Sequence, residues 1–364
     1  MPEYDVVVVG AGSAGLNTAI ACAKAGLSVA VIEEHGKIGF PRHCSGLYST
    51  RFLGMMDVRK EFYEHEIFGA KFHSPSGKIV ELMRKERAAF VINREALDAY
   101  LSRVAAENGV NVMSGVKVVD FDTGNDVCQI TMEKGTVESS LMCGADGSNS
   151  FVSRKLGFRA PNKLHGIMAI TKEGNYDNYV DLYFDNKLYP GFFAWKIPRG
   201  RTVEYGIAGN IGPPNVQNFN NFLAKFGVTK YELSSGVIPF GFQKSYANRV
   251  LLVGDAAAQV KPLTGGGVIY GMICARIAAK TFADATHEKK FGEKFLARYQ
   301  KAWKASIGKG ISRGLAIRKV YSKMPNSMID ASFGVLSTRV VAKFLENHGD
   351  MEFILERKPH AAVS

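Results

Sequence analysis

The sequence predicts an α/β protein whose parallel-sheet domain is discontinuous, carries an inserted β-rich domain and is followed by a helical C-terminal region. Three features predict this architecture. The chain opens with a strand, turn, helix and strand in residues 4–32. A further buried strand, a glycine-rich loop and a helix follow only at residues 250–283. Short strands rich in aromatic residues occupy much of the chain between residues 163 and 238.

Length and composition favour a folded protein of two packed regions. The chain has 364 residues, more than one ordinary core accommodates. Its hydrophobic fraction of 46% and charged fraction of 22% exclude extensive disorder. No apolar run reaches the ~18–20 residues that span a bilayer. The Met1-Pro2-Glu3 start has no basic leader before an apolar stretch, so we expect a cytoplasmic protein.

The five cysteines give no sign of a metal site. They lie at positions 22, 44, 128, 143 and 274, and none forms a C-x-x-C pair. Zinc and iron–sulfur sites usually need such pairs, so no metal is expected. The odd count and the scattered spacing indicate reduced thiols.

Local periodicity defines the elements of the first βαβ unit. Tyr4–Val9 is short and β-branched, as in a buried strand, and Gly10–Gly15 predicts a tight turn. Leu16–Ala25 predicts a helix that ends at Gly26, and Ser28–Ile32 predicts the second strand.

The remaining elements follow from the same patterns. We expect a hairpin over Ile67–Leu82, with its turn at Ser74–Gly77, and a helix over Arg94–Glu107. Further expected elements are strands at Val110–Met113, Val116–Phe121 and Val250–Val253, and helices near Val216–Phe226 and Gly266–Ala283. The tail is expected to be helical, with breaks at Pro325, Gly334 and Gly349.

These elements suggest a division of the chain into three parts. Residues 1–66, 86–160 and 246–290 are expected to form the discontinuous nucleotide-binding domain. Residues 67–85 and 161–245 would form the β-rich substrate-binding region, and residues 291–364 the helical C-terminal region.

The N-terminal turn carries the first functional motif. Gly10-Ala11-Gly12-Ser13-Ala14-Gly15 is a G-x-G-x-x-G sequence between a strand and a helix. Such glycines allow a tight turn and a close approach to a pyrophosphate, which sits at the positive end of the helix. Glu33 ends the next strand, where an acid binds the ribose hydroxyls of an adenosine. An ordinary glycine turn is the alternative interpretation.

A second motif makes the interpretation more specific. Gly254-Asp255 follows a strand, and Gly265-Gly266-Gly267 opens a helix. Paired with the N-terminal unit, this segment resembles the ribitol-binding motif of glutathione-reductase-like flavoproteins. The resemblance implies a Rossmann-like FAD-binding domain. The helix start would stabilise negative charge on a reduced flavin.

Two further segments are similar to flavin hydroxylase-like proteins. Gly144–Ser150, with Arg154 after it, resembles their G-A-D-G-x-x-S stretch. Both a structural turn and a cofactor contact remain open for this segment. Arg94 matches an arginine that lies near the FAD phosphates in these families, with a plain surface arginine as the alternative.

Two loops resemble the geranylgeranyl reductase family. Ile38–Gly46 matches its I-G-x-P-x-x-C-x-G sequence, and Pro190–Pro198 has the spacing of its P-x-x-Y-x-W-x-F-P sequence. Phe193 replaces the tyrosine, so no phenol is available there as a proton donor, and Ile197 replaces the phenylalanine. A plain aromatic core strand is the alternative for the second segment.

The resemblance implies a set of site residues. Cys44 would be catalytic, as the proton donor, or would only shape its loop. FAD would be bound by Gly10, Gly12, Ala14, Gly15, Glu33, Arg42, Cys44, Ser45, Leu47, Arg94, Val118, Asp255, Gly265, Gly266, Gly267 and Val268. The substrate would contact Pro190, Phe193, Trp195 and Pro198.

The implied function is an FAD-dependent reductase that saturates C=C bonds of geranylgeranyl chains on diphosphates or archaeal-type phospholipids. Electrons would come from NAD(P)H or a reduced ferredoxin. No second nucleotide-binding glycine motif is visible, so a nicotinamide donor would have to dock transiently. The alternatives are a flavin-dependent monooxygenase, halogenase or quinone reductase, and a non-catalytic lipid- or flavin-binding protein.

The charge of the chain is uneven. The formal net charge is +12, and residues 281–364 contain 15 Lys and Arg against 8 Asp and Glu. A basic region suits an anionic membrane surface on the inner face of the membrane, while a solvated basic face is the alternative. We expect an isoprenoid lipid and an electron-donor protein as partners, and no nucleic acid.

Overall fold

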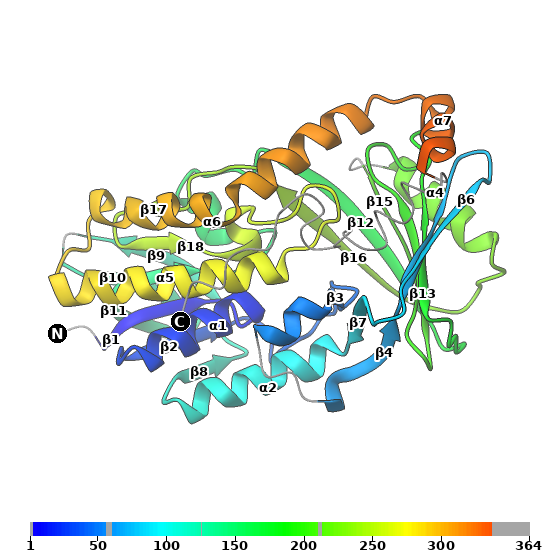
Figure 1. The fold of residues 1–364 in the computed structure, drawn as a ribbon. Helices are drawn as coiled ribbons and strands as arrows, with labels where there is room; N and C mark the ends of the chain where they lie inside the picture. The colour runs from blue at the N-terminus through cyan, green and yellow to red at the C-terminus, as the bar shows by residue number, and fades with distance from the viewer. Residues whose placement is uncertain (1–2, 56–59, 125, 210–212, 337–364) are drawn as a thin grey trace. The chain divides into compact units, whose positions relative to one another are not determined.

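A computed structural model describes residues 3–55, 60–124, 126–209 and 213–336. The α/β class predicted from the sequence is confirmed (Figure 1). The chain divides into two compact units. Unit 1 comprises Met1–Arg42, Glu95–Asn162 and Ile238–Ser312, and unit 2 comprises His43–Arg94, Lys163–Val237 and Arg313–Ser364.

Unit 1 is built on a mainly parallel sheet. In the described residues this sheet has eight strands, in the order β17-β18-β11-β1-β2-β8, with β10 paired to β11 and β9 paired to β10. Its strands are β1 (Tyr4–Val9), β2 (Val29–Glu33), β8 (Asn111–Ser114), β9 (Val118–Thr123), β10 (Cys128–Met132), β11 (Gly135–Gly144), β17 (Tyr246–Ala247) and β18 (Val250–Leu252). Strand β1 pairs in parallel with both β2 and β11, and β11 pairs in parallel with β18.

The helices of unit 1 flank this sheet. They are α1 (Ser13–Lys24), α2 (Arg94–Glu107), α3 (Phe151–Lys155), α5 (Val268–Glu288) and most of α6 (Glu293–Tyr321). Figure 1 shows α1 and α5 side by side. The two helices approach each other closely at Gly271, where an added Cβ atom would lie 3.3 Å from the Cβ atom of Ala14. Fully buried Val6, Val7 and Val8 of β1 explain why this segment forms the central strand.

Unit 2 is dominated by antiparallel strands. In the described residues its large sheet has seven strands, in the order β16-β12-β15-β14-β13-β5-β6, and its small sheet has the order β3-β7-β4. The large sheet contains β5 (Gly69–His73), β6 (Ile79–Met83), β12 (Asn162–Thr171), β13 (Tyr179–Tyr183), β14 (Ala194–Pro198), β15 (Val203–Gly209) and β16 (Glu232–Phe240). The small sheet contains β3 (Leu47–Ser49), β4 (Tyr63–Ile67) and β7 (Ala89–Ile92).

The helices of unit 2 are α4 (Pro213–Ala224) and α7 (Asn326–Leu336), with short 3₁₀ turns at Thr50–Gly54 and Lys60–Phe62. Helix α4 packs on the sheet through Phe219, Phe222 and Leu223, which are almost fully buried. Helix α7 is anchored by Ile329 and Phe333, which pack against Val80 of β6.

Residues 43–66 and 86–94 fall in unit 2, whereas the division drawn from the sequence assigned them to the FAD-binding region. The reason is strand pairing, because β3 and β4 both pair with β7. The predicted break at Gly334 is wrong, since this exposed glycine lies inside α7, where it needs no special backbone conformation. Gly349 and the rest of 337–364 lie outside the described residues.

Candidate functional site

The N-terminal turn has the geometry of a pyrophosphate cradle. Gly10 has φ of 102°, and a Cβ atom there would lie 2.5 Å from the carbonyl oxygen of Ala145. A Cβ atom on Gly15 would lie 2.0 Å from the carbonyl oxygen of Gly10. A Cβ atom on Gly12, in contrast, would meet no protein atom within 4 Å. Gly10 and Gly15 are therefore required by the fold, while Gly12 leaves space at the start of α1 for a ligand.

Glu33 is tied to this turn from the end of β2. The backbone N–H of Ala11 donates to Glu33 Oε2 at 2.8 Å, and the backbone N–H of His35 donates to Oε1 at 2.9 Å. His35 Nδ1 lies 2.7 Å from the same Oε1. The carboxylate is thus held beside the glycine turn, as a ribose-binding acid requires.

The second motif lies against the first, although Gly254 and Ala14 are about 240 residues apart in the sequence. Gly254 follows β18 with φ of 70°, and a Cβ atom there would lie 2.8 Å from the Cβ atom of Ala14. The next residue, Asp255, faces the start of α5, because a Cβ atom on Gly267 would lie 2.6 Å from Asp255 Oδ1. The side chain of Lys261 packs against the glycines of this loop, since a Cβ atom on Gly266 would lie 3.1 Å from its Nζ. Small residues therefore bring both motifs to one end of the sheet.

The residues of unit 1 fit an FAD molecule. Gly12 offers open space at a helix start, where backbone N–H groups bind phosphate, and Glu33 and Asp255 offer acceptors for sugar hydroxyls. Val268 begins α5, with Gly265 and Gly266 just before its N-cap Gly267. Val118 contributes its side chain to the core, so only its backbone remains for a cofactor.

Arg42 and the 144–150 segment have structural partners in unit 1. Arg42 forms an ion pair with Glu95, with Nε and Nη2 at 3.1 and 3.0 Å from Oε1. Asp146 Oδ1 accepts a hydrogen bond from the Ser150 hydroxyl, and Oδ2 accepts one from the backbone N–H of Val152 at 3.0 Å. Burial raises the pKa of Asp146. These contacts favour the structural interpretation of this segment, which caps α3.

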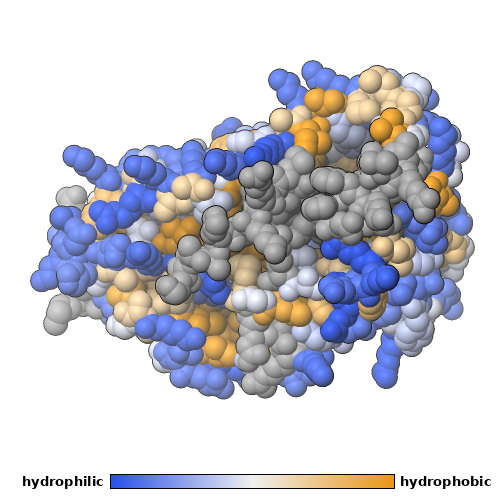
Figure 2. Space-filling view, in the orientation of Figure 1, coloured by the Kyte–Doolittle hydropathy of each residue, from blue (hydrophilic) through white to orange (hydrophobic). Residues whose placement is uncertain are grey.

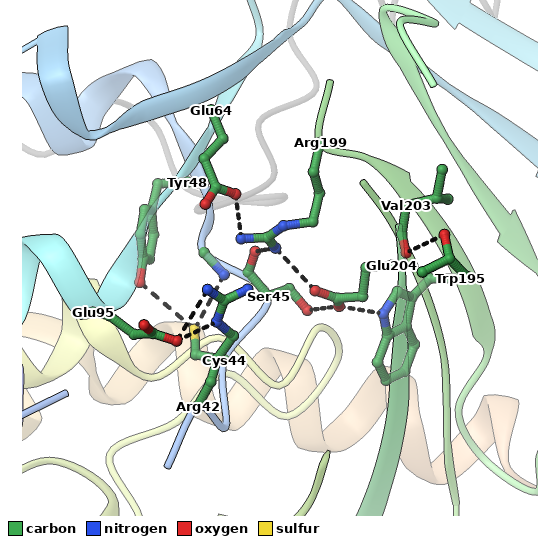
Figure 3. Close-up of polar contacts among 12 residues, drawn as sticks. Arg42, Cys44, Ser45, Tyr48, Glu64, Glu95, Trp195, Arg199, Val203 and Glu204 are labelled. Carbon is green, nitrogen blue, oxygen red and sulfur yellow. Dashed lines mark hydrogen bonds and ion pairs between the residues drawn. The ribbon is translucent and has the colours of Figure 1, made fainter. Parts of the chain in front are cut away.

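Cys44 lies in unit 2, just before strand β3. Its Sγ is 3.6 Å from the hydroxyl of Tyr48 and 3.5 Å from the backbone N–H of Gly46 (Figure 3). Arg94 Nη1 donates to the same Tyr48 hydroxyl at 2.9 Å. The structure therefore places the guanidinium of Arg94 on Tyr48, a residue with no functional signal in the sequence. Leu47 begins β3 and packs beside the buried Val91 cluster.

Cys44 differs from the other four cysteines in exposure. Cys22, Cys128, Cys143 and Cys274 are fully buried, whereas Cys44 is half-buried. Burial raises the pKa of all four buried thiols, in the case of Cys128 to about 12. A reagent or substrate therefore meets Cys44 before any other thiol of the chain.

The predicted substrate segment lies on and before β14. Phe193 stacks on Phe192, with ring centroids 4.2 Å apart, and meets the edge of Trp195 at 6.2 Å. Pro190 is half-buried before the strand, and Pro198 is buried at its end. The indole of Trp195 lies over Gly206 of β15, where a Cβ atom would come within 2.2 Å of ring carbons. Glycine at this position makes room for the ring.

A buried acid connects this segment with the Cys44 loop. Glu204 of β15 is 0% exposed, and its Oε1 accepts hydrogen bonds from the Ser45 hydroxyl and, at 2.8 Å, from Trp195 Nε1 (Figure 3). We did not predict Glu204 from the sequence. A charged residue inside the apolar strand Val203–Gly209 was the one available signal, because buried charges usually have a specific partner.

Comparison with known proteins identifies relatives of this chain. A protein-family model for FAD dependent oxidoreductases matches residues 5–147. Digeranylgeranylglycerophospholipid reductase from Methanocaldococcus jannaschii is 30% identical over 349 residues, which cover 90% of this chain and 89% of that protein.

Solved structures share the fold. A geranylgeranyl bacteriochlorophyll reductase-like protein from Thermoplasma acidophilum superimposes with a TM-score of 0.88 at 22% identity, covering 97% of this chain and 94% of that one. The halogenase PltM, solved in complex with FAD, superimposes with a TM-score of 0.70 at 14% identity, covering 95% and 85% of the two chains. At these identities the likeness establishes the architecture and not the reaction.

Proposed function

The chain belongs to the digeranylgeranylglycerophospholipid reductase family of FAD-dependent oxidoreductases, and on this premise we propose that it saturates C=C bonds of geranylgeranyl chains. The substrates are geranylgeranyl diphosphates or archaeal-type phospholipids. The observation that carries the proposal is the 30% identity to a reductase of this name over 90% of the chain. The link between Ser45, the neighbour of Cys44, and Trp195 through Glu204 supports it, because it joins the two segments that resemble this family.

The protein groups have two tasks in this reaction. Reduced FAD, when bound, supplies hydride to one alkene carbon. An isolated alkene is not electron-poor, so the protein must hold it in a fixed, water-excluded position. Phe193 and Trp195 supply apolar surface for this task, and the Cys44 thiol supplies the proton for the second alkene carbon. We propose that NAD(P)H or a reduced ferredoxin restores the reduced cofactor.

Product analysis tests the proposed reaction. Chemically reduced holoenzyme is incubated without oxygen with a geranylgeranyl phospholipid, and the lipid is examined by mass spectrometry. We expect two hydrogens to be gained per reduced double bond, together with oxidation of the flavin. Oxygenated or halogenated product formed only in air would instead support the monooxygenase or halogenase alternative. FAD binding with no flavin oxidation by the lipid would support a non-catalytic protein.

We also propose that helix α6 brings the enzyme to an anionic membrane surface. Residues 294–329 contain nine Lys and Arg and no Asp or Glu. The positive excess of residues 281–364 lies wholly in 281–336, because residues 337–364 carry four basic and four acidic residues. The exposed bases on α6 are Lys294, Arg298, Lys301, Lys304, Lys309, Arg313 and Lys319. Binding of this basic helix to an anionic membrane would bring the enzyme close to a lipid substrate.

Exposed apolar residues adjoin this basic helix. Val320 near the end of α6 is 65% exposed, and Met328 and Val335 on α7 are 55% and 61% exposed. The acid of α7, Asp330, accepts hydrogen bonds from the hydroxyls of Ser74 and Ser76 at 2.6 and 2.7 Å. Its carboxylate is therefore bound by groups of unit 2. Figure 2 shows hydrophobic side chains at the upper right, where α7 lies in Figure 1. Within the described residues, no helix is long and apolar enough to cross a bilayer.

Charge reversal on α6 is expected to weaken binding to anionic vesicles. Each lysine near such a surface contributes ~1 kcal/mol, so Lys301→Glu with Lys304→Glu should lower the affinity on the order of tenfold or more. Binding of the wild type should also fall as salt rises. The matched control reverses Lys24 and Lys134, two exposed lysines remote from α6 in the sequence. Vesicle sedimentation measures the difference, and equal loss in both double variants would contradict a role for α6.

A further inference from the structure

The carboxylate of Glu204 is the centre of a buried polar network in unit 2. One oxygen, Oε1, accepts from Ser45 and Trp195, and the other, Oε2, accepts from Arg199 Nη1 at 3.0 Å (Figure 3). Ser45 and Glu204 are 159 residues apart in the sequence. One side chain therefore connects a loop before β3 with adjacent strands of the large sheet.

Arg199 extends the network and is only 3% exposed. Its Nη1 also donates to the carbonyl oxygen of Ser45 at 2.5 Å, and its Nη2 faces Glu64 Oε2 at 2.6 Å as an ion pair. Ser45 is thus held through its side chain and its main chain at once. Two carboxylates, those of Glu64 and Glu204, face the single guanidinium of Arg199. The network therefore contains one more acidic side chain than basic side chains.

The two segments joined by Glu204 are also constrained on their other sides. Gly46 has φ of 68°, a Cβ atom there would lie 2.2 Å from the carbonyl oxygen of Ile92, and the Ile92 N–H donates to the Gly46 carbonyl at 2.9 Å. Trp195 lies over Gly206. The two residues that follow Cys44 are therefore fixed, and the thiol position follows from them.

We propose that Glu204 is a positioning residue that fixes the Cys44 loop and the Trp195 indole relative to each other. This inference rests on the proposed function. A buried ion pair contributes little to stability, because the desolvation of the charges offsets their attraction. A reaction between an alkene and a proton donor, in contrast, loses rate steeply when either group moves by an ångström. Glu204 is 0% exposed, so it acts through Ser45 and Trp195, which donate hydrogen bonds to it.

The test compares two oxidants of the reduced holoenzyme. A geranylgeranyl lipid needs both positioned segments, whereas ferricyanide takes electrons from reduced flavin without them. Glu204→Gln keeps the size of the side chain. It replaces the carboxylate, which accepts hydrogen bonds from Ser45, Trp195 and Arg199, by an amide. We expect flavin oxidation by the lipid to slow about 10- to 100-fold. Oxidation by ferricyanide should change less than about twofold, because electron transfer from the flavin needs no aligned donor.

Ser45→Ala and Trp195→Phe each remove one donor to Oε1, so they should give the same pattern with smaller effects. Ser45→Ala also decides the matter if Glu204→Gln fails to fold, whereas Trp195→Phe alone does not, because the indole itself supplies surface for the alkene. Asp330→Asn is the matched control, because it weakens a carboxylate network in unit 2 that contacts neither segment. Equal slowing with both oxidants, or no slowing with either, would overturn the proposal.

A second readout does not depend on the reaction. Iodoacetamide should modify Cys44 about tenfold faster in Glu204→Gln, which corresponds to ~1.4 kcal/mol easier opening of the loop. The four buried cysteines give little background. Peptide mass spectrometry measures the rates. If the wild type shows no lipid-dependent flavin oxidation, the proposed function fails while this measurement still decides whether Glu204 holds the loop. Unchanged modification of Cys44 would then overturn the positioning role.

Discussion

Cys44→Ala is expected to slow lipid-dependent flavin oxidation about 100-fold or more, because general acids typically contribute 10²–10⁴-fold. The variant should still bind FAD, since the residues that fit the cofactor in unit 1 do not include this thiol. Cys44→Ser should give a smaller loss, as a hydroxyl keeps a proton but releases it less readily. The measurement is anaerobic single-turnover oxidation of the reduced enzyme.

Cys128→Ala provides the control for this prediction. This cysteine is fully buried in the core of unit 1, so its loss tests for nonspecific effects of removing a thiol. Wild-type rates in Cys44→Ala would leave that residue with a loop-shaping role. Proton delivery would then pass to water or to His43, whose Nδ1 lies 3.4 Å from the Ser234 hydroxyl.

Gly12→Ala is expected to produce a folded protein that binds FAD poorly. The added methyl group meets no protein atom within 4 Å, so the apo-protein should retain its melting temperature. The same methyl group occupies the space in which a pyrophosphate approaches the start of α1. Overpacking of a close contact costs ~1–3 kcal/mol, which corresponds to a loss of about 10- to 100-fold in FAD affinity. Fluorescence titration of the apo-protein measures the dissociation constant.

Two other glycines make this experiment interpretable. Gly334→Ala is the control, because its methyl group also meets nothing within 4 Å and the residue lies inside α7, where alanine is a better helix former than glycine. Gly15→Ala should instead destabilise the fold, since its Cβ atom would lie 2.0 Å from the carbonyl oxygen of Gly10. Wild-type FAD affinity in Gly12→Ala would rule out the cradle at this turn.

The elements of the candidate FAD site in unit 1 could be predicted from the sequence, because their signals are local. The strand Tyr4–Val9 and the helix Arg94–Glu107 have the bounds that periodicity predicts. The glycine turn and Glu33 follow from the spacing within one βαβ unit. The position of Asp255 just after a strand also predicts its role from the sequence. The contact between Gly254 and Ala14, in contrast, is visible only in the structure.

The network around Cys44 was not accessible in the same way. Tyr48 reads as an ordinary core aromatic, and its hydroxyl becomes informative only when Arg94, 46 residues away, donates to it. Glu204 meets Ser45 across 159 residues, and no periodic pattern encodes such a contact. A resemblance to a family identified Cys44 and Trp195, but it did not identify the side chains that hold them.

The order of strands in unit 1 has a consequence for synthesis on the ribosome. Strand β11 lies between β1 and β18, so the centre of the sheet combines segments from the beginning, middle and last third of the chain. Translation at about 5–20 residues per second separates the emergence of β1 from that of β18 by many seconds. Both strand partners of β1, namely β2 and β11, emerge before β18, so during this interval it is β11 that lacks one of its parallel partners. Cofactor capture is therefore a late event, which follows the emergence of α5, and a chain released before that point lacks the acid and the helix start of the second motif.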